Sequence, residues 1–134
     1  MEYLTYKSYF GEHKVYIKLG HYAYDNSLSI LLVCEDNEPF GRITVCIPDN
    51  WTDKPDNWAY VDINNMPQAI DFIKKYNLGK PVTNVKGEQV IKLSGYVFYP
   101  LYNFDMKEIY KYMKAIIIMI ISKIKCKEGT KYGF

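Results

Sequence analysis

Residues 15–47 read VYIKLGHYAYDNSLSILLVCEDNEPFGRITVCI, and this stretch decides the fold class. Apolar and polar side chains alternate from Val15 to Leu19, which is the two-residue period of a β-strand. Turn-forming clusters at residues 25–27 and 35–39 separate this run from the apolar runs that follow. Because the intervals between the runs are short, we expect successive strands to pair as an antiparallel meander.

The same patterns continue on both sides of this stretch. Strands are expected near residues 3–10, 14–22, 27–34, 40–47, 58–63 and 90–99. The third strand alternates least, so we expect it at the centre of the sheet, covered on both faces. The prediction is a single α+β domain over residues 1–134, an antiparallel meander of five to six strands packed with two helices, the longer one C-terminal.

The first predicted helix spans about residues 66–77. Asn65 is a suitable N-cap and Pro67 suits the first helical turn. Gly79 is expected to take the left-handed conformation that ends the helix. Residues 80–88 are expected to form a loop, and Pro100 to end the strand after it.

The second predicted helix runs from Met106 to about Lys127, and Asp105 with Glu108 forms its capping box. Its middle, Ala115–Ile121, is apolar on all sides, which is typical of a helix that docks on the protein's own core. The alternative is contact with a partner or with a second copy in a homodimer. The side chains off the main stripe that would make this contact are Ile118, Met119 and Ile121.

Composition excludes several classes of protein. A chain of 134 residues with 49% hydrophobic residues can bury a core without disulfides or metals.

Cys34, Cys46 and Cys126 lack the paired spacing of a zinc site, and Cys34 and Cys46 are expected to be buried, reduced thiols. The longest apolar run has seven residues, far short of the roughly twenty that span a membrane. We expect a soluble, cytoplasmic protein with no metal, no cofactor and no membrane partner.

Motifs of common enzymes are missing from the sequence. It contains no glycine-rich phosphate or dinucleotide loop, no HExxH and no GxSxG. A non-enzymatic protein is therefore expected.

Charge divides unevenly along the chain. Residues 35–73 contain two basic and eight acidic side chains, a net charge of −6, and residues 74–134 contain twelve lysines and four acids, a net charge of +8. The acidic part could meet a basic partner surface, and the basic part could bind nucleic acid, although solvated faces also carry such charges. Arg42 is the only arginine, which disfavours sequence-specific DNA recognition.

Two tryptophans near the acidic loop 48–57 are the candidate anchors for a protein partner. Buried aromatic side chains carry much of the energy of protein interfaces. Trp51 lies between prolines in this loop and Trp58 begins a strand; for both side chains the alternative place is the protein's own core. The candidate partner-binding residues are Trp51, Asp53, Asp56, Trp58, Asp62 and Asn64.

Four segments are distinctive: YVDINNMP at residues 60–67, NLGKP at 77–81, GYVFYPLYNFD at 95–105, and the turn EPF at 38–40 followed by ITV at 43–45. Together they resemble a small uncharacterised family found in phages and integrative elements. The resemblance covers roughly residues 14–112 and includes neither the segment 86–88 nor the isoleucine-rich C-terminal helix.

The setting that this resemblance implies suggests a function. Small proteins of mobile elements without catalytic motifs commonly occupy the surface of another macromolecule. We therefore expect an inhibitor of a host defence complex, of the anti-CRISPR kind, that binds a CRISPR-Cas nuclease effector. The alternative is a nucleic-acid-associated accessory protein that uses the basic C-terminal half.

Overall fold

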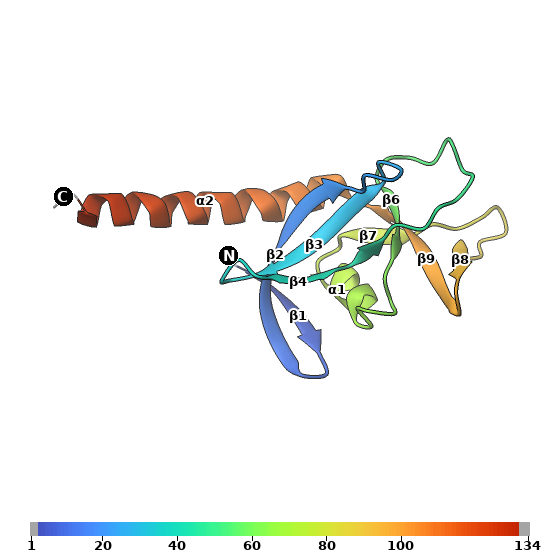
Figure 1. Cartoon of the computed structure of the whole chain (residues 1–134), viewed down its shortest axis with the longest axis horizontal. Coiled ribbons are helices and arrows are strands. Elements are labelled where there is room, and N and C mark those ends of the chain that lie inside the picture. The colour runs from blue at the N-terminus through green and yellow to red at the C-terminus, as the bar shows by residue number, and fades with distance from the viewer. Residues whose placement is uncertain (1–2, 132–134) are drawn as a thin grey trace.

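A computed structural model describes the backbone of residues 3–131 and the side chains of residues 3–125. The architecture is α+β, with antiparallel strands and a longer C-terminal helix, as the sequence predicts (Figure 1). The elements in chain order are β1 (Leu4–Ser8), β2 (Gly11–His21), β3 (Leu28–Cys34), β4 (Pro39–Arg42), β5 (Thr44–Val45), β6 (Trp58–Val61), α1 (Ala69–Lys75), β7 (Gly79–Pro81), β8 (Ile91–Ser94), β9 (Val97–Phe104) and α2 (Met106–Lys131).

The first four strands form a sheet in chain order, which is the predicted meander. In its turns, Asn26 and Asn37 adopt positive φ angles of 60° and 69°, a conformation that asparagine tolerates better than most residues. The inner strand β3 is buried at five of its seven residues, so both of its faces are covered, as its weak alternation predicts.

A second sheet follows, with the strand order β5-β6-β9-β7 and with β8 paired to β9. The predicted strand 40–47 is therefore divided, because β4 stays in the first sheet and β5 begins at Thr44 in the second. Between them, Ile43 donates its N–H to the Ile30 carbonyl at 3.0 Å and accepts the Asp62 N–H at 2.9 Å. The buried Thr44 hydroxyl accepts the Ile30 N–H at 3.0 Å. This crossover ties the two sheets together through the main chain.

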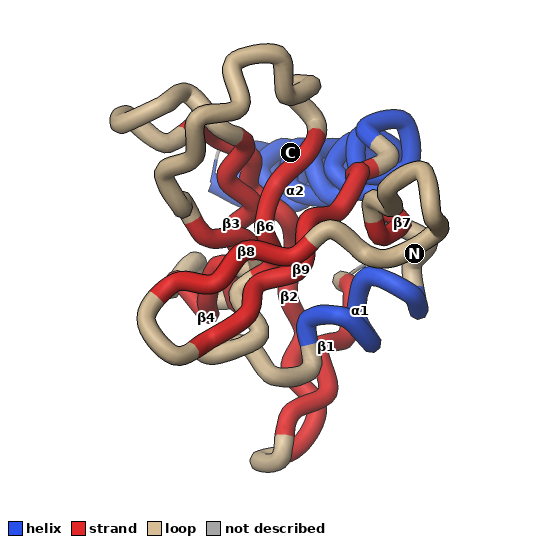
Figure 2. Tube along the Cα trace, turned by 90° about the vertical axis from the view of Figure 1, so that its right-hand side faces the viewer, coloured by secondary structure: helices blue, strands red, loops and turns tan. Residues whose placement is uncertain are grey.

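The larger core contains buried side chains from both sheets and both helices. An aromatic row runs through it, with ring centroids 5.5 Å apart for Tyr6 and Phe72, 5.2 Å for Phe72 and Tyr76, and 5.6 Å for Tyr76 and Tyr112. The Tyr76 hydroxyl also accepts the Thr5 N–H at 2.6 Å. Helix α1 lies beside β1 (Figure 2). The aromatic row joins α1 to β1 through Tyr6 and Phe72, and joins α1 to α2 through Tyr76 and Tyr112.

The start and the end of α1 differ from the prediction. Asn65 is not its N-cap, because the backbone N–H and side-chain amide of Asn65 donate to the Asp62 carboxylate at 3.1 and 2.9 Å. This turn delays the helix to Ala69, with Gln68 at the N-cap position. At the other end, the left-handed residue is Asn77, with a φ of 55°, and not Gly79.

Two further predictions about the second sheet were wrong. Residues 80–88 are not all loop, since β7 extends to Pro81. The predicted strand 90–99 is a hairpin, with Gly95 in its turn at a φ of 63°. Pro100 lies inside β9, at the point where β9 changes partners from β8 to β6 and β7. A residue without an N–H is tolerated there because one ladder of hydrogen bonds ends and the next begins.

The N-terminus of α2 is capped as predicted. The Asp105 carboxylate accepts the Glu108 N–H at 3.2 Å, but the capping box is not reciprocal, because Glu108 pairs instead with Lys111 at 3.1 Å. Ile109 and Ile116 bury against the body, and beyond them α2 extends well past the sheets (Figure 1). Within the part of the chain that the structure describes, no helix has both the length and the apolar character to cross a membrane.

We predict that Gly79→Ala destabilises the protein by about 1–3 kcal/mol. A Cβ atom at Gly79 would lie 2.8 Å from the Asn103 carbonyl oxygen and 3.2 Å from the Phe104 Cα, both main-chain atoms that cannot yield. Urea unfolding measures the change in the free energy of unfolding. The control is Gly20→Ala in β2, where no atom lies within 4 Å of the added methyl group. Equal stability of the two variants would contradict the close approach of β7 to β9.

Candidate protein-binding site

The loop between β5 and β6, residues 46–57, brings the two tryptophans together. The rings of Trp51 and Trp58 meet edge to face, with centroids 5.5 Å apart and planes at 82°. Trp51 is 43% exposed, whereas Trp58 is half-buried and packs against the smaller core. The Trp51 ring therefore packs on Trp58 on one side and is open to solvent on the other.

Acidic side chains surround this aromatic pair. A cavity of about 190 Å³ opens between the loop and the β2–β3 turn. Its lining residues are Asp25, Asn26, Ser27, Asp49, Trp51, Thr52, Lys54, Pro55, Asp56 and Trp58. Three carboxylates against one lysine give the site negative charge. Of the sequence candidates, Asp53 is exposed in the same loop but does not line the cavity.

The loop is attached to the second sheet by an ion pair between Asp49 and Lys54, both of which also contact the Tyr60 side chain of β6. The Asp49 carboxylate accepts from Lys54 Nζ at 3.2 Å and from the Tyr60 hydroxyl at 3.0 Å, and Lys54 Nζ lies 5.1 Å from the centre of the Tyr60 ring. Burial favours the neutral form of Asp49, but the hydrogen bonds from Lys54, Tyr60 and the Trp51 N–H outweigh it, so the pKa of Asp49 is lowered. Burial and the neighbouring Asp49 raise the pKa of Tyr60 to about 12.

Asp25 and Cys46 are parts of the site that the sequence did not reveal, because they meet only when the β2–β3 turn folds onto the loop. The Asp25 carboxylate accepts the Ser27 N–H at 3.0 Å and lies 3.5 Å from the Cys46 thiol. Burial opposes ionisation of Asp25, yet these hydrogen bonds lower its pKa overall. Burial raises the pKa of the Cys46 thiol, which keeps it protonated and a poor nucleophile at neutral pH.

The cysteines are less buried than predicted. Cys34 and Cys46 are both partly exposed, because each lies near a strand end where a turn covers only one side. Burial and nearby acidic side chains raise the pKa of Cys34 as well. The side chain of Cys126 lies outside those that the structure describes.

Asp62 and Asn64 do not join the tryptophan site. Asp62 is only 7% exposed, and its two carboxylate oxygens accept hydrogen bonds from Asn65, so it shapes the turn before α1. Asn64 is exposed and lines a different cavity, which shares no lining residue with the tryptophan site. The acidic side chains of residues 35–73 do not all gather at this site, because Glu35 lines a cavity beside α2 whereas Asp49 lines the tryptophan site.

The apolar middle of α2 is only partly core. Ile116 is buried at 5% exposure, whereas Ile118 and Ile121 are 56% and 46% exposed and Met119 is intermediate. The stripe that faces the body continues as Ile120 and Ile124, which are 38% and 50% exposed and which line an open cavity against the end of the first sheet. The prediction that the middle of this helix docks on the protein's own core therefore holds at Ile116 and is wrong at Ile118 and Ile121.

We predict that Tyr60→Phe changes how stability depends on pH. The protonated phenol is favoured in the folded protein, so its contribution is complete below pH 10 and is lost as the pH rises toward 12. The wild-type free energy of unfolding should fall by about 2 kcal/mol more than that of Tyr60→Phe across this interval. Denaturant unfolding at a series of pH values measures the difference. The control is Tyr24→Phe, whose ring is 76% exposed, and the hydrogen bond to Asp49 is refuted if all three curves are parallel.

A family model described as a domain of unknown function, DUF4313, matches residues 16–124. The match confirms the expected relation to an uncharacterised family. It also covers the segment 86–88 and the isoleucine-rich part of α2, which the resemblance did not include. No curated protein and no solved structure matches the chain.

Proposed function

We propose that this protein, which belongs to the DUF4313 family, is a non-enzymatic inhibitor that binds a host defence nuclease complex of the CRISPR-Cas type. The proposed surface is the tryptophan site, with Trp51 as the anchor and the surrounding carboxylates as the polar rim. The mobile-element setting comes from the sequence resemblance, and the choice of a nuclease comes from charge.

The observation that carries the proposal is that the exposed indole of Trp51 lies among acidic side chains. Tryptophan is enriched among the residues that dominate protein interfaces, and Trp51 is held in place by its edge-to-face contact with Trp58. A ring that is already ordered loses little entropy when a partner covers it. The loop is further fixed by Asp49, Lys54 and Tyr60, so the site is formed before binding.

The acidic charge indicates what the partner surface carries. Nucleases bind phosphate backbones with lysine and arginine, and such surfaces attract anionic groups. Asp25, Asp49 and Asp56 line the cavity beside Trp51. A protein that places these carboxylates over a basic nucleic-acid channel would compete with the nucleic acid.

We predict that Trp51→Ala weakens binding to the sensitive nuclease effector about tenfold or more, chiefly by faster dissociation. Asp53→Asn with Asp56→Asn should slow association instead and reduce its dependence on salt. Surface plasmon resonance with guide-loaded effectors, together with DNA-cleavage assays, measures both. The control is Tyr96→Ala, whose ring is fully exposed in the β8–β9 turn. The proposal fails if no effector is bound or inhibited, or if Trp51→Ala behaves like Tyr96→Ala.

The alternative function is nucleic-acid binding through α2. Lys107, Lys111, Lys114, Lys123 and Lys125 are all exposed on this helix. Binding of single-stranded DNA or RNA that weakens steeply with salt, and that Trp51→Ala leaves unchanged, would favour this alternative over the proposed inhibitor.

We further propose that α2 pairs with a second copy of the chain beyond the edge of the sheet. Ile117, Ile118 and Ile121 are each about half exposed there, an apolar surface that a homodimer would cover. The wild-type protein should then have twice the 15.8 kDa mass of one chain. Light scattering measures this, and Ile118→Lys with Ile121→Lys should give a monomer. The control is Ile91→Lys on β8, 51% exposed, which should remain dimeric. A monomeric wild-type protein at high concentration would exclude the pairing.

A further inference from the structure

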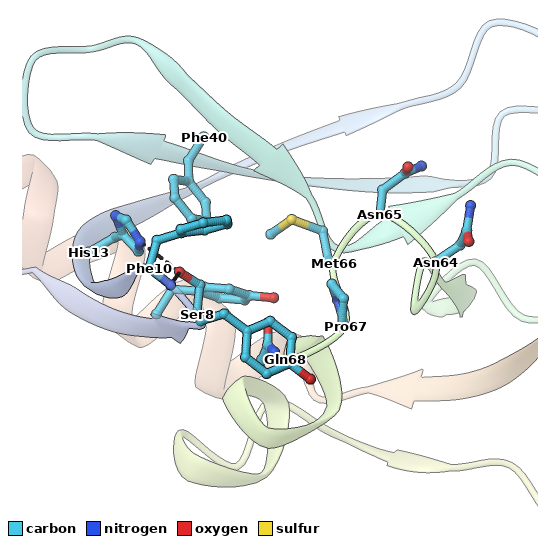
Figure 3. A pocket seen from close by; sticks show the side chains of 11 residues that line it. Ser8, Phe10, His13, Phe40, Asn64, Asn65, Met66, Pro67 and Gln68 are labelled. Atoms are coloured by element: carbon cyan, nitrogen blue, oxygen red, sulfur yellow. Dashed lines mark hydrogen bonds between the residues drawn. The ribbon is translucent and has the colours of Figure 1, made fainter.

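The cavity that Asn64 lines is at the tip of the β1–β2 hairpin, apart from the tryptophan site. It has a volume of about 420 Å³, within the range of small-ligand pockets. The hairpin tip, Phe40 of β4 and the segment that enters α1 surround it (Figure 3). Its lining residues are Tyr6, Ser8, Tyr9, Phe10, His13, Phe40, Asn64, Asn65, Met66, Pro67 and Gln68.

The inner wall of the cavity is made largely of aromatic rings that contact one another. The Phe40 ring lies 5.2 Å from the Tyr6 ring and 4.8 Å from the His13 ring, between centroids. Phe40 forms one side and the Met66 thioether faces it, while the exposed Phe10 ring lies at the mouth (Figure 3). Met66 can reach this position because residue 41 is glycine: a Cβ there would lie 2.6 Å from its sulfur. Flat, polarisable walls of this kind suit a planar ring.

The Tyr6 side chain lines the cavity, and its buried hydroxyl is an unused hydrogen-bond donor. The residue is only 2% exposed, and among the described residues its hydroxyl has no hydrogen-bond partner. A buried polar group without a partner is costly and uncommon in native proteins. An acceptor atom supplied by a ligand would satisfy it.

The hairpin tip leaves two aromatic rings uncovered beside this donor. Tyr9 and Phe10 are 85% and 94% exposed. The tip is nevertheless fixed, since the Ser8 hydroxyl accepts the Phe10 N–H at 3.1 Å and lies 2.9 Å from His13 Nε2. Large apolar side chains held in water at the mouth of an apolar cavity are typical of a binding site.

The surrounding charges restrict the ligand. Within the described chain, none of the lining side chains is an aspartate, glutamate, lysine or arginine. Burial is the main cause of the raised pKa of Tyr6; the nearby backbone N–H of Gln68 lowers this pKa, and the charge of Asp71 raises it further. A nearby negative charge disfavours an anion at the Tyr6 hydroxyl, and no fixed cation is present in the lining to offset it.

We propose that this cavity binds a neutral, planar aromatic group that carries a hydrogen-bond acceptor. The ring lies against Phe10 and Phe40, and its acceptor takes the proton of the Tyr6 hydroxyl in a hydrogen bond. A free heterocycle and an aromatic side chain of a partner protein share this chemistry. The site is independent of the tryptophan site, so neither proposal depends on the other.

Two neutral probes and one anionic probe test this proposal. Thymine represents a free heterocycle, N-acetyltyrosinamide represents a partner's side chain, and benzoate is the anionic control. Titration of the ¹⁵N-labelled protein, followed by amide NMR shifts, should show saturable shifts at residues 8–13 and 64–68 with at least one neutral probe and none with benzoate. The probe that binds more tightly identifies the source. No shift with either neutral probe at millimolar concentration would overturn the proposal.

Tyr6→Phe separates a ligand-binding hydroxyl from a structural one. The variant should weaken binding of the neutral probe about five- to tenfold, the worth of one hydrogen bond. Its melting temperature without probe should not fall, because it removes a hydroxyl whose proton has no acceptor among the described residues. The control Tyr24→Phe, at an exposed ring, should bind like wild type. Unchanged affinity in Tyr6→Phe, or a clear loss of stability without probe, would refute the proposed role.

Discussion

The crossover at Ile43 and Thr44 is the constraint on which the rest of the structure depends. Ile43 bonds to Ile30 in the first sheet and to the Asp62 N–H beyond the second, while the Thr44 hydroxyl accepts from Ile30. Both residues are almost fully buried, so these bonds have no competing water and are costly to break. They fix the start of the second sheet against the middle of the first.

Both candidate sites follow from this junction. The chain leaves β5 into the loop of residues 46–57, which returns as β6, and the tryptophan pair forms where this loop closes on the β2–β3 turn. At the other end of β6, Asp62 holds the turn that carries Met66 under the β1–β2 hairpin. One strand therefore separates an acidic aromatic surface from a neutral aromatic cavity, and the two differ in charge because different turns contribute to each.

Prediction from sequence succeeded where a signal is local. Asn26, Asn37 and Asp105 lie where turn and cap chemistry places them, since each acts on a backbone group a few residues away. Prediction failed where the role of a residue depends on a segment distant in the sequence. Gly79 is a residue type that commonly ends helices, yet here its lack of a side chain lets the backbone of β9 pack close to β7. Pro100 looks like a strand end, yet it marks an exchange of strand partners.

The sequence by itself determined the α+β class, the meander, the capped C-terminal helix and the loop that carries Trp51, because periodicity, turn residues and loop composition act over short distances. Only the tertiary structure decided that the strands divide into two sheets, that Trp51 contacts Trp58, and that α2 leaves its isoleucines from Ile117 to Ile124 exposed. It alone also placed the Tyr6 hydroxyl where no described residue satisfies it. These features depend on which distant segments meet, and pairing between distant segments is set by the packing of the whole chain.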